Sequence, residues 1–289
     1  MKNCKVTQNE HLFGFLFVLP AVIGIFVFII IPIIGSFYLS FNEWNLLDKI
    51  TFVGLKNYKA VLTEKYFVQI FINTVVYALS TTFFAVVIPL LIADILNKKI
   101  KLAEFFKTIF FIPFITPVVV IAIVWSQIFD PASGFINQVF HTHSTWLFDK
   151  NLAMPLLIFI SVWRLLGYNI ILFLTGYVSI NPNLYEAAKI DGANNFQIFR
   201  KITLPLLKPT IYFVTLVTAI SSFQVFDLVY IMTEGGPENS TNIIVYSIYK
   251  YAFEYFDIGK SCAMAYLLFI AILILAIIQR KLQKENSIE

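Results

Sequence analysis

The charged residues that could do chemistry inside the apolar parts of this chain are few. Arg164 and Asp227 are the two that fall well within long apolar stretches. A bare charge at the middle of a bilayer costs roughly 2.5–3.5 kcal/mol on insertion scales, so each needs a partner or an aqueous cavity. Counted at about 1.5 Å per residue, both lie toward the outer side of the membrane. We therefore predict that they form an intramembrane ion pair, either structural or as the latch of an outer gate.

Neutral polar and aromatic side chains in the same stretches could bind a sugar through hydrogen bonds and ring faces. The candidates are Ser161, Tyr168, Asn169, Ser221, Ser222 and Gln224, with Phe114 and Val118 beside two prolines. Polar residues inside membrane spans mark cavities or helix contacts, and hydrogen bonding between helices explains each residue equally well. The residues alone leave the two roles open.

The sequence offers no pattern for catalysis or for a resident metal. His141 and His143 form an H-x-H pair without further ligands, which is more typical of a solvated loop than of a metal site. Cys4 and Cys262 are too few for a disulfide framework. No G-x-x-x-x-G-K-[ST] loop occurs, so nucleotide hydrolysis would have to come from another polypeptide. We expect no catalytic residue, metal or cofactor in this chain.

The elements that position these residues are membrane spans. The chain has 59% hydrophobic and only 13% charged residues, too little charge to cover a soluble surface. A helix needs about 20 apolar residues to cross the hydrocarbon. In this chain of 289 residues, six stretches meet or approach that length: 12–39, 68–95, 108–129, 155–179, 210–232 and 261–279. They predict an all-α membrane protein with a single domain, 1–289. We expect the first to be an uncleaved span and the third to kink near Pro113 and Pro117.

The distribution of Lys and Arg predicts the orientation of these spans. With the N-terminus inside, the inner segments carry most of the 21 Lys and Arg residues, as the positive-inside rule requires. Both termini should therefore be cytoplasmic. The net charge of +4 fits anionic lipid headgroups at the inner surface, and we expect no nucleic-acid partner.

The connection 180–209 between the fourth and fifth spans has the signals of an ordered helix-turn-helix. Asn181 can cap a helix whose first position is Pro182, and Gly192 should end it. A second short helix should begin near Asn195, with the unit closed by two prolines, Pro205 and Pro209. Small side chains beside Gly192 (Ala187, Ala188 and Ala193) would let another protein approach closely. The alternative is a helix pair lying on lipid.

This connection also carries a long motif. Glu186 to Pro209 read EAAKIDGANNFQIFRKITLPLLKP, which resembles the EAA loop of binding-protein-dependent ABC importer permeases. Phe111 to Asn137, the region of Trp163 and Gly167, and Phe226 to Thr241 look like the carbohydrate-uptake branch, similar to maltose, oligosaccharide and glycerol-phosphate permeases. The resemblance covers most of the chain.

The resemblance implies a type I importer fold with a cytoplasmic coupling helix. It implies four kinds of partner: a second homologous permease in a heterodimer, two cytosolic ATPase subunits that hold ATP and Mg²⁺, an extracellular solute-binding protein, and the sugar it delivers. The residues implied to couple this chain to the ATPase are Glu186, Ala187, Ala188, Asp191, Gly192, Ala193, Leu204 and Pro205. Those implied to line the substrate pathway are Phe114, Val118, Ser161, Leu165, Tyr168, Ser221 and Gln224.

Two other readings remain open at this stage. A secondary transporter would need intramembrane carboxylates or broken helices to couple to an ion, and the chain offers only Asp94 beside Lys98 and the isolated Asp227. Within the family, glycerol phosphate or a polyol could replace the sugar. In each case we expect a protein of a bacterial plasma membrane.

Overall fold

The structure is a computed structural model that describes residues 8–98 and 102–285. The chain separates into two compact units. Unit 1 comprises the N-terminal part up to residue 64 together with residues 248–267, and unit 2 comprises residues 65–247 together with the segment from 268 on. Each unit is described by itself. That the whole chain is one membrane domain stays a prediction.

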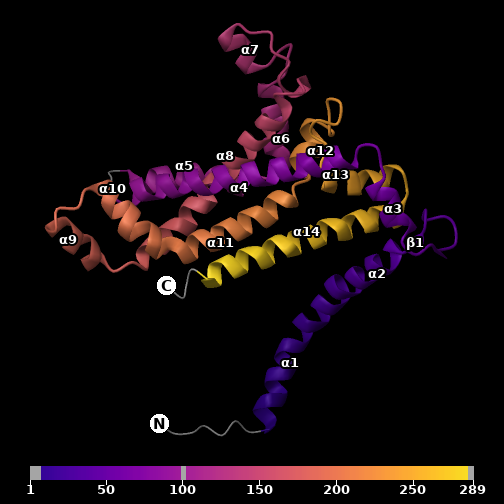
Figure 1. Cartoon of the computed structure of the whole chain (residues 1–289), viewed down its shortest axis with the longest axis horizontal. Coiled ribbons are helices and arrows are strands. Elements are labelled where there is room, and N and C mark those ends of the chain that lie inside the picture. The colour runs from indigo at the N-terminus through magenta and orange to yellow at the C-terminus, as the bar shows by residue number, and fades with distance from the viewer. Residues whose placement is uncertain (1–7, 99–101, 286–289) are drawn as a thin grey trace. The chain divides into compact units, whose positions relative to one another are not determined.

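Helices dominate the described residues, and Figure 1 traces them in chain order. Five helical stretches are long and apolar enough to cross a membrane, and a sixth is obtained when the bent pair α5–α6 counts as one span. The segments that form them are α1 (Gln8–Ile25), η1 (Phe26–Ile30) and α2 (Ile31–Ser40); α4 (Phe67–Asn97); α5 (Ala103–Ile115) with α6 (Val118–Ile128); α8 (Ala153–Val178); α10 (Asn195–Ile198), η3 (Phe199–Thr203) and α11 (Leu204–Phe223); and α14 (Ile258–Glu285). The predicted all-α fold with about six spans is confirmed.

The third span is broken rather than kinked. The axes of α5 and α6 meet at 97°. Thr116, which lies between the two helices, is extended with φ −73° and ψ 134°. A residue that precedes proline is pushed out of the helical region by the proline ring, and Pro117 follows it. Pro113, by contrast, lies inside α5, so the break occurs at the second of the two prolines.

The fifth span differs from its predicted range of 210–232 at both ends. It runs as one helical stretch from Asn195 to Phe223, with Pro205 in the first turn of α11 and Pro209 inside it. The two prolines therefore do not close the loop. The π-helical segment η3 directly precedes α11, and in a membrane bundle neighbouring groups can satisfy the carbonyls that a proline frees. At the other end, Gln224 leaves the helical conformation and α12 (Asp227–Met232) begins a separate short helix.

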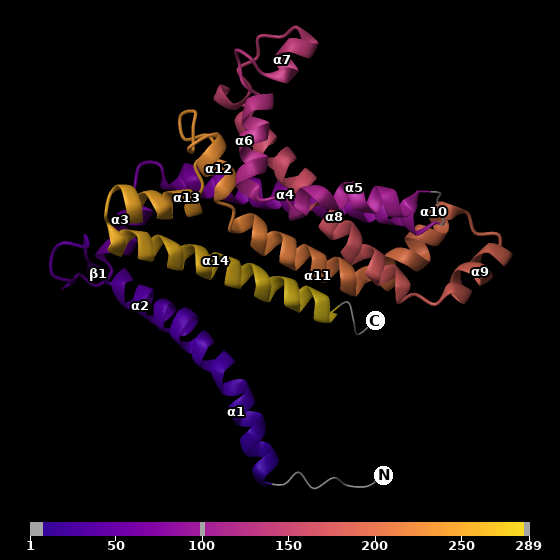
Figure 2. The ribbon, with the colours of Figure 1, turned by 180° about the vertical axis from the view of Figure 1, so that it is seen from behind.

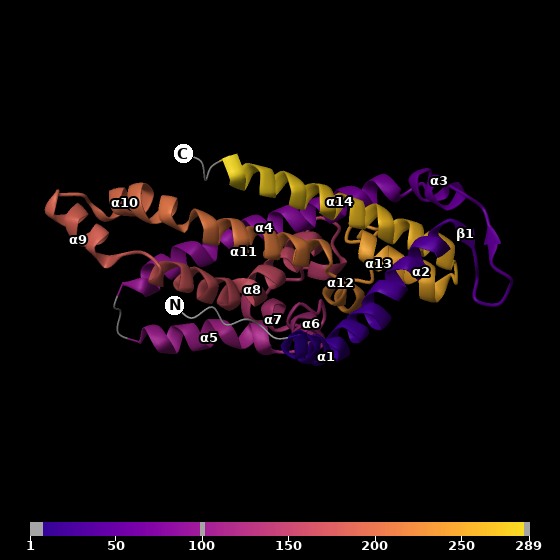
Figure 3. The same ribbon diagram turned by 90° about the horizontal axis from the view of Figure 1, so that it is seen from below.

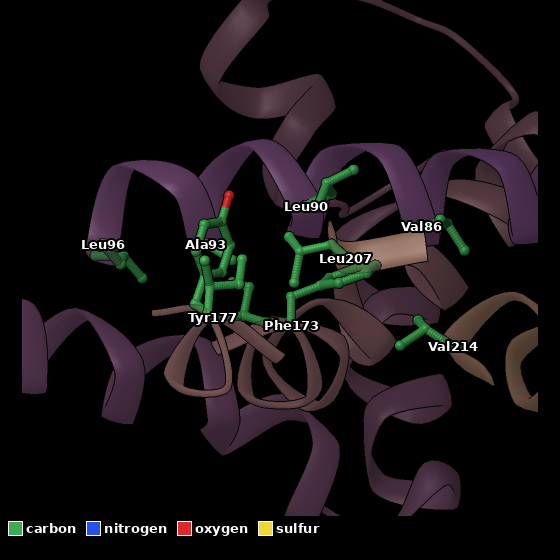
Figure 4. Packing of buried hydrophobic residues seen from close by; sticks show 10 residues of the cluster. Val86, Leu90, Ala93, Leu96, Phe173, Tyr177, Leu207 and Val214 are labelled. Carbon is green, nitrogen blue, oxygen red and sulfur yellow. The ribbon is translucent and has the colours of Figure 1, made fainter. Parts of the chain in front are cut away.

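Unit 2 is built around α4, α5, α8 and α11, which run side by side (Figures 1 and 3). The core between α4, α8 and α11 contains Ile170, Phe173, Leu207 and Val214, all with 0% of their surface exposed. Figure 4 shows this cluster, to which α4 contributes Leu90 and Leu96. Because lipid is as apolar as these side chains, their association rests on tight packing.

Two glycines in α8 allow the neighbouring helices to approach closely. A Cβ atom on Gly167 would lie 2.1 Å from the carbonyl oxygen of Phe110 in α5. One on Gly176 would lie 2.6 Å from the hydroxyl of Thr210 in α11. Small residues at such crossings are typical of helix packing in membranes, and they fix α8 between its two neighbours.

Unit 1 contains the first span and the short elements after it: β1 (Asn42–Glu43), which pairs antiparallel with β2 (Thr51–Phe52), and α3 (Lys56–Leu62). The Asn57 side-chain amide donates to the carbonyls of Ser40 at 2.9 Å and Asn42 at 2.8 Å. From the later part of the chain, Lys260 pairs with Glu64 at 3.0 Å. Tyr251 donates to the same carboxylate, and burial is the main cause that raises the pKa of this tyrosine.

The remaining elements are short. In unit 2 they are α7 (Phe135–Phe140), η2 (Trp146–Phe148) and α9 (Pro182–Ile190), while α13 (Ile244–Tyr249) and η4 (Lys250–Glu254) lead into α14. Figures 1 and 2 show α6 leaving the layer of long helices, with α7 beyond its far end. α9 lies at one end of the long helices of unit 2, and α12 lies at the opposite end (Figure 3).

Candidate functional site

The EAA loop, residues 180–209, is ordered by its own backbone signals. The side-chain oxygen of Asn181 accepts a hydrogen bond from the Asn183 N–H at 3.0 Å and caps α9. At the other end Gly192 adopts φ +78°, and the Ala193 N–H donates to the Ala188 carbonyl at 2.9 Å, as in a Schellman motif. The predicted helix from Pro182 and its end at Gly192 are both present.

The second half of the loop begins with a capping box. Asn194 and Gln197 each accept a hydrogen bond from the other's N–H at 2.9 Å. This arrangement satisfies two of the N–H groups that a helix start leaves without partners. The helix predicted near Asn195 is therefore present, but it continues into α11 through the π-helical segment η3.

The loop is attached to the bundle by a few side chains. Tyr185, Phe199 and Leu204 pack against the core cluster of unit 2. Ala188 and Ile198 are buried. Of the residues implied to seat in an ATPase, Ala188 thus faces this chain itself, whereas Glu186, Ala187 and the turn residue Asp191 are exposed.

Two large apolar side chains of the same loop are exposed. Ile190 is 86% exposed and Phe196 is 69% exposed. A Cβ atom on Gly192, which lies between them in sequence, would have no heavy atom within 4 Å. Ala193 is partly buried, and Pro205 is exposed at the start of α11. An ordered, open apolar surface of this kind is a feature of interaction sites.

The residues implied to line the substrate pathway divide into two groups. The rings of Phe114 and Tyr168 stack with centroids 4.5 Å apart, and Ser161 hydrogen-bonds to Tyr77. Leu165 is buried, and Val118 is partly buried. Ser221 and Gln224, on α11 and directly after it, are exposed. The structure thus brings Phe114 and Tyr168 together from α5 and α8, and leaves Ser221 and Gln224 without cover in the single chain.

Some of the polar candidates take part in helix packing. The Asn169 amide donates to the Ala85 carbonyl at 2.6 Å and to the Thr218 hydroxyl at 3.1 Å, joining α8 to α4 and α11. Asn169 and Ser222 are almost fully buried. Tyr77, the partner of Ser161, went unnoticed in the sequence because a tyrosine in an apolar run has no pattern of its own.

Arg164 and Asp227 do not form an ion pair in the described structure. The Nε of Arg164 is buried without a hydrogen-bond partner among the described residues. Asp227 is exposed at the first position of α12. The predicted pair stays a prediction.

At the opposite end of the bundle lies the GGP loop, residues 233–243, which is tied to α4. The side-chain amide of Asn73 donates to the carbonyls of Asn239 at 2.8 Å and Asn242 at 2.9 Å. The Thr74 hydroxyl accepts from the N–H of Ile244, the residue after the loop, at 2.9 Å. Thr241 is 0% exposed and donates to the Gly236 carbonyl. Residues 240–243 of this loop are thus buried against its own chain, and only Glu234 and Glu238 of residues 233–243 are exposed.

Metal ligands do not gather in the described residues. No group of three or more His, Cys, Asp or Glu side chains is placed to hold an ion in residues 8–98 and 102–285. His141 and His143 are both exposed in the segment between α7 and η2.

Comparisons with known proteins agree on one family. The family model "Binding-protein-dependent transport system inner membrane component" matches residues 85–286. A probable ABC transporter permease, YurN of Bacillus subtilis, is 33% identical over 98% of this chain and 100% of its own length. The trehalose/maltose transport system permease MalF of Thermococcus litoralis is 31% identical over 96% of this chain and 95% of its own.

A solved structure has the same fold. It is a chain of a bacterial ABC transporter that imports the acidic polysaccharide alginate, with a TM-score of 0.85 and 21% identity over 97% of both chains. The chain therefore belongs to the family of inner membrane components of binding-protein-dependent transport systems, as a multi-pass, non-catalytic permease subunit.

Proposed function

We propose that this chain is the transmembrane subunit of an ATP-driven carbohydrate importer in a bacterial plasma membrane, where it forms half of the pathway beside a second, homologous permease. A carbohydrate substrate is supported by the names of its relatives, which include permeases for trehalose/maltose and for starch degradation products. A partner permease is supported by the exposure of Ser221 and Gln224, which a second subunit would cover.

The observation that carries the proposal is the EAA loop. Ile190 and Phe196 are exposed on a segment that its caps hold rigid and that Tyr185, Phe199 and Leu204 connect to the core. A cytosolic ATPase can do work on a membrane bundle only through a contact that differs between its two states. A rigid element fixed to α8 and α11 at its two ends supplies such a contact.

The ATP and Mg²⁺ that drive transport belong to two ATPase subunits, one of which docks on this loop. Movement of α9 then passes to α8 through Tyr185 and to α11 through Phe199 and Leu204, since these side chains pack on the shared core. The stacked pair Phe114 and Tyr168 lies where α5 meets α8, and rearrangement there would open or close the pathway. Arg164 and Asp227 come together as a latch in one of the two states.

This mechanism requires both termini and the EAA loop in the cytoplasm, as the Lys and Arg distribution predicts. The GGP loop, at the opposite end of the bundle, then faces the solute-binding protein that delivers the sugar. The alginate importer has been solved with a substrate-bound periplasmic protein, which supports a partner of this class.

The experiment is uptake and ATP hydrolysis by the reconstituted complex with its binding protein. Glu186→Ala and Gly192→Val should leave assembly intact but abolish sugar-stimulated hydrolysis and uptake. Glu104→Ala removes an exposed carboxylate outside the loop and should behave as wild type. Normal uptake in both loop variants, or uptake that survives ATP depletion and stops with an uncoupler, would contradict the proposal and favour an ion-coupled transporter.

A further inference from the structure

A hollow at the end of the bundle opposite the EAA loop is separate from the residues implied to line the pathway. It measures about 450 Å³ and lies between the end of α6 and the residues of α12 and the GGP loop. Its lining includes Ser126, Phe129, Asp130, Phe148 and Glu234. A second hollow of about 540 Å³ shares Ser126, Asp130 and Ile231 with it, so the two adjoin. Small-molecule sites commonly occupy roughly 300–1,000 Å³.

Three polar groups of the hollow have unused hydrogen-bonding capacity. Ser126 Oγ is buried without a partner among the described residues. Asp130 Oδ1 accepts from Ala132 N, Ser133 N and Ser133 Oγ, whereas its Oδ2 has no partner in the described part of the chain. The carboxylate of Glu234 likewise has no hydrogen bond or ion pair within the described residues. Of the three, only the Ser126 Oγ atom is buried, and buried polar groups normally find partners. Asp130 is half-exposed and Glu234 is exposed, so both carboxylates can be reached by the hydroxyls of a ligand.

The carboxylate of Asp130 is held ionised and oriented. The hydrogen bond from the Ser133 N–H is the main cause that lowers the pKa of Asp130. A Cβ atom on Gly134 would lie 2.3 Å from the Asp130 carbonyl, so only glycine permits this tight turn. The turn fixes Oδ1 and leaves the second oxygen for a donor outside the chain.

Aromatic rings form one wall of the hollow. Phe129 stacks on Trp125 with centroids 5.4 Å apart and contacts Trp146 at 5.6 Å. The Trp146 indole N–H donates to Asn137 at 2.7 Å, which fixes its ring. Phe148 lines the same hollow and is 69% exposed. The exposed ring of Phe148 offers a surface on which a sugar ring can stack.

We propose that this hollow is an entry subsite for a neutral saccharide, whose hydroxyls donate to Asp130 and Glu234 while a ring face lies on Phe148. This inference rests on the proposed function, because it adds a subsite for the transported carbohydrate. None of its described lining residues is cationic, and two carboxylates repel the carboxylate of a uronic acid. The subsite therefore selects neutral sugars over acidic ones before the membrane interior is reached.

The test is equilibrium binding of radiolabelled maltotriose to the purified complex without binding protein and without nucleotide. The Asp130→Asn, Glu234→Gln double variant should bind at least tenfold more weakly, about 1.4 kcal/mol. Phe148→Ala is a second variant that leaves both carboxylates in place and should weaken binding similarly. Glu238→Gln removes a carboxylate of the same loop that does not line the hollow and should retain the binding.

Several results would overturn the subsite. These are no maltotriose binding at millimolar concentration, equal affinity in the assembled double variant and in Phe148→Ala, equal affinity for trigalacturonate, or an equal loss of binding in the control Glu238→Gln. Tight Ca²⁺ binding that depends on both carboxylates, without saccharide binding, would assign the hollow to a cation. Because this assay needs neither transport nor hydrolysis, its failure is distinguishable from a failure of the EAA-loop variants, which concern coupling.

Discussion

The EAA loop and the GGP loop, at opposite ends of the same bundle, differ in where their backbone groups find hydrogen-bond partners and in how far their side chains are buried. The GGP loop buries Thr241 and Ile243 to 0% and 1% exposure and binds its carbonyls to Asn73 of α4. The EAA loop satisfies its backbone locally through caps and leaves Ile190 and Phe196 exposed. The GGP loop is held by contacts within its own chain, whereas the EAA loop has an apolar surface that its own chain does not cover.

This contrast teaches where stability and function separate in the molecule. Changes in the GGP loop should act first on the folding of the subunit, because its partners lie inside the chain. Changes to the exposed side chains of the EAA loop should act on coupling and transport and leave the isolated subunit as stable as before.

The largest effect should come from the double variant Ile190→Asp, Phe196→Asp. Burial of a large apolar side chain is worth about 1.5–3 kcal/mol, so losing two anchors should reduce ATP-dependent uptake at least 100-fold, about 2.7 kcal/mol. The thermal unfolding midpoint of the subunit should not change, since neither side chain is buried. Leu47→Asp, at a residue that is 92% exposed outside the loop, is the control. A lowered midpoint, or an equal loss in the control, would break the comparison.

Asn73→Ala should produce the largest loss of stability. It removes both hydrogen bonds from Asn73 to the GGP loop. The Asn239 carbonyl keeps longer bonds from Gln69 and from the Asn242 N–H, so the main cost is the Asn242 carbonyl that loses its side-chain donor, about 1–3 kcal/mol. We expect the free energy of unfolding in mixed micelles to fall by about 1–3 kcal/mol. Gln69→Ala, which removes two longer bonds of 3.3 Å, should cost less. Equal values for the two variants would show that the loop does not depend on Asn73.

Gly235→Ala and Gly192→Ala form a matched pair, one in each loop. Their φ angles are +77° and +78°, so both substitutions carry the left-handed backbone cost of about 1–2 kcal/mol. Only Gly235 is also crowded, with a Tyr246 ring carbon at 3.0 Å and the Asn242 Cβ at 3.2 Å from the new atom. The unfolding free energy should therefore fall further for Gly235→Ala. Identical losses would mean that the packing of the GGP loop contributes nothing.

The smallest effect should come from Lys150→Met. Lys150 pairs with Glu238 of the GGP loop at 3.1 Å, but the two side chains are 58% and 76% exposed. Exposed ion pairs contribute about 0–1 kcal/mol, so the unfolding free energy should change by less than about 0.5 kcal/mol and lose any dependence on salt. A larger loss would indicate that this exposed pair, and not the buried bonds of Asn73, secures the loop.

Parts of the candidate sites could be predicted because they follow from local chemistry. Asn181 and Pro182 start α9, and Gly192 ends it. The bend of 97° at Thr116 was only partly foreseen, since a proline marks a possible break and not its angle. The hydrogen bond from Asn73 to Asn239 of the GGP loop joins residues 166 positions apart, and no pattern in the sequence predicts it. The hollow beside Asp130 likewise draws its lining from separate segments.

The sequence by itself determined how many apolar stretches this protein has, where its capped turns lie and which family motif it carries, because length, hydropathy and capping act between near neighbours. Only the tertiary structure decided that the third span is broken, that the fifth ends at Phe223, and that Asn169 joins three helices. Those features depend on contacts between residues that are distant in the sequence, and such contacts form only when the helices pack.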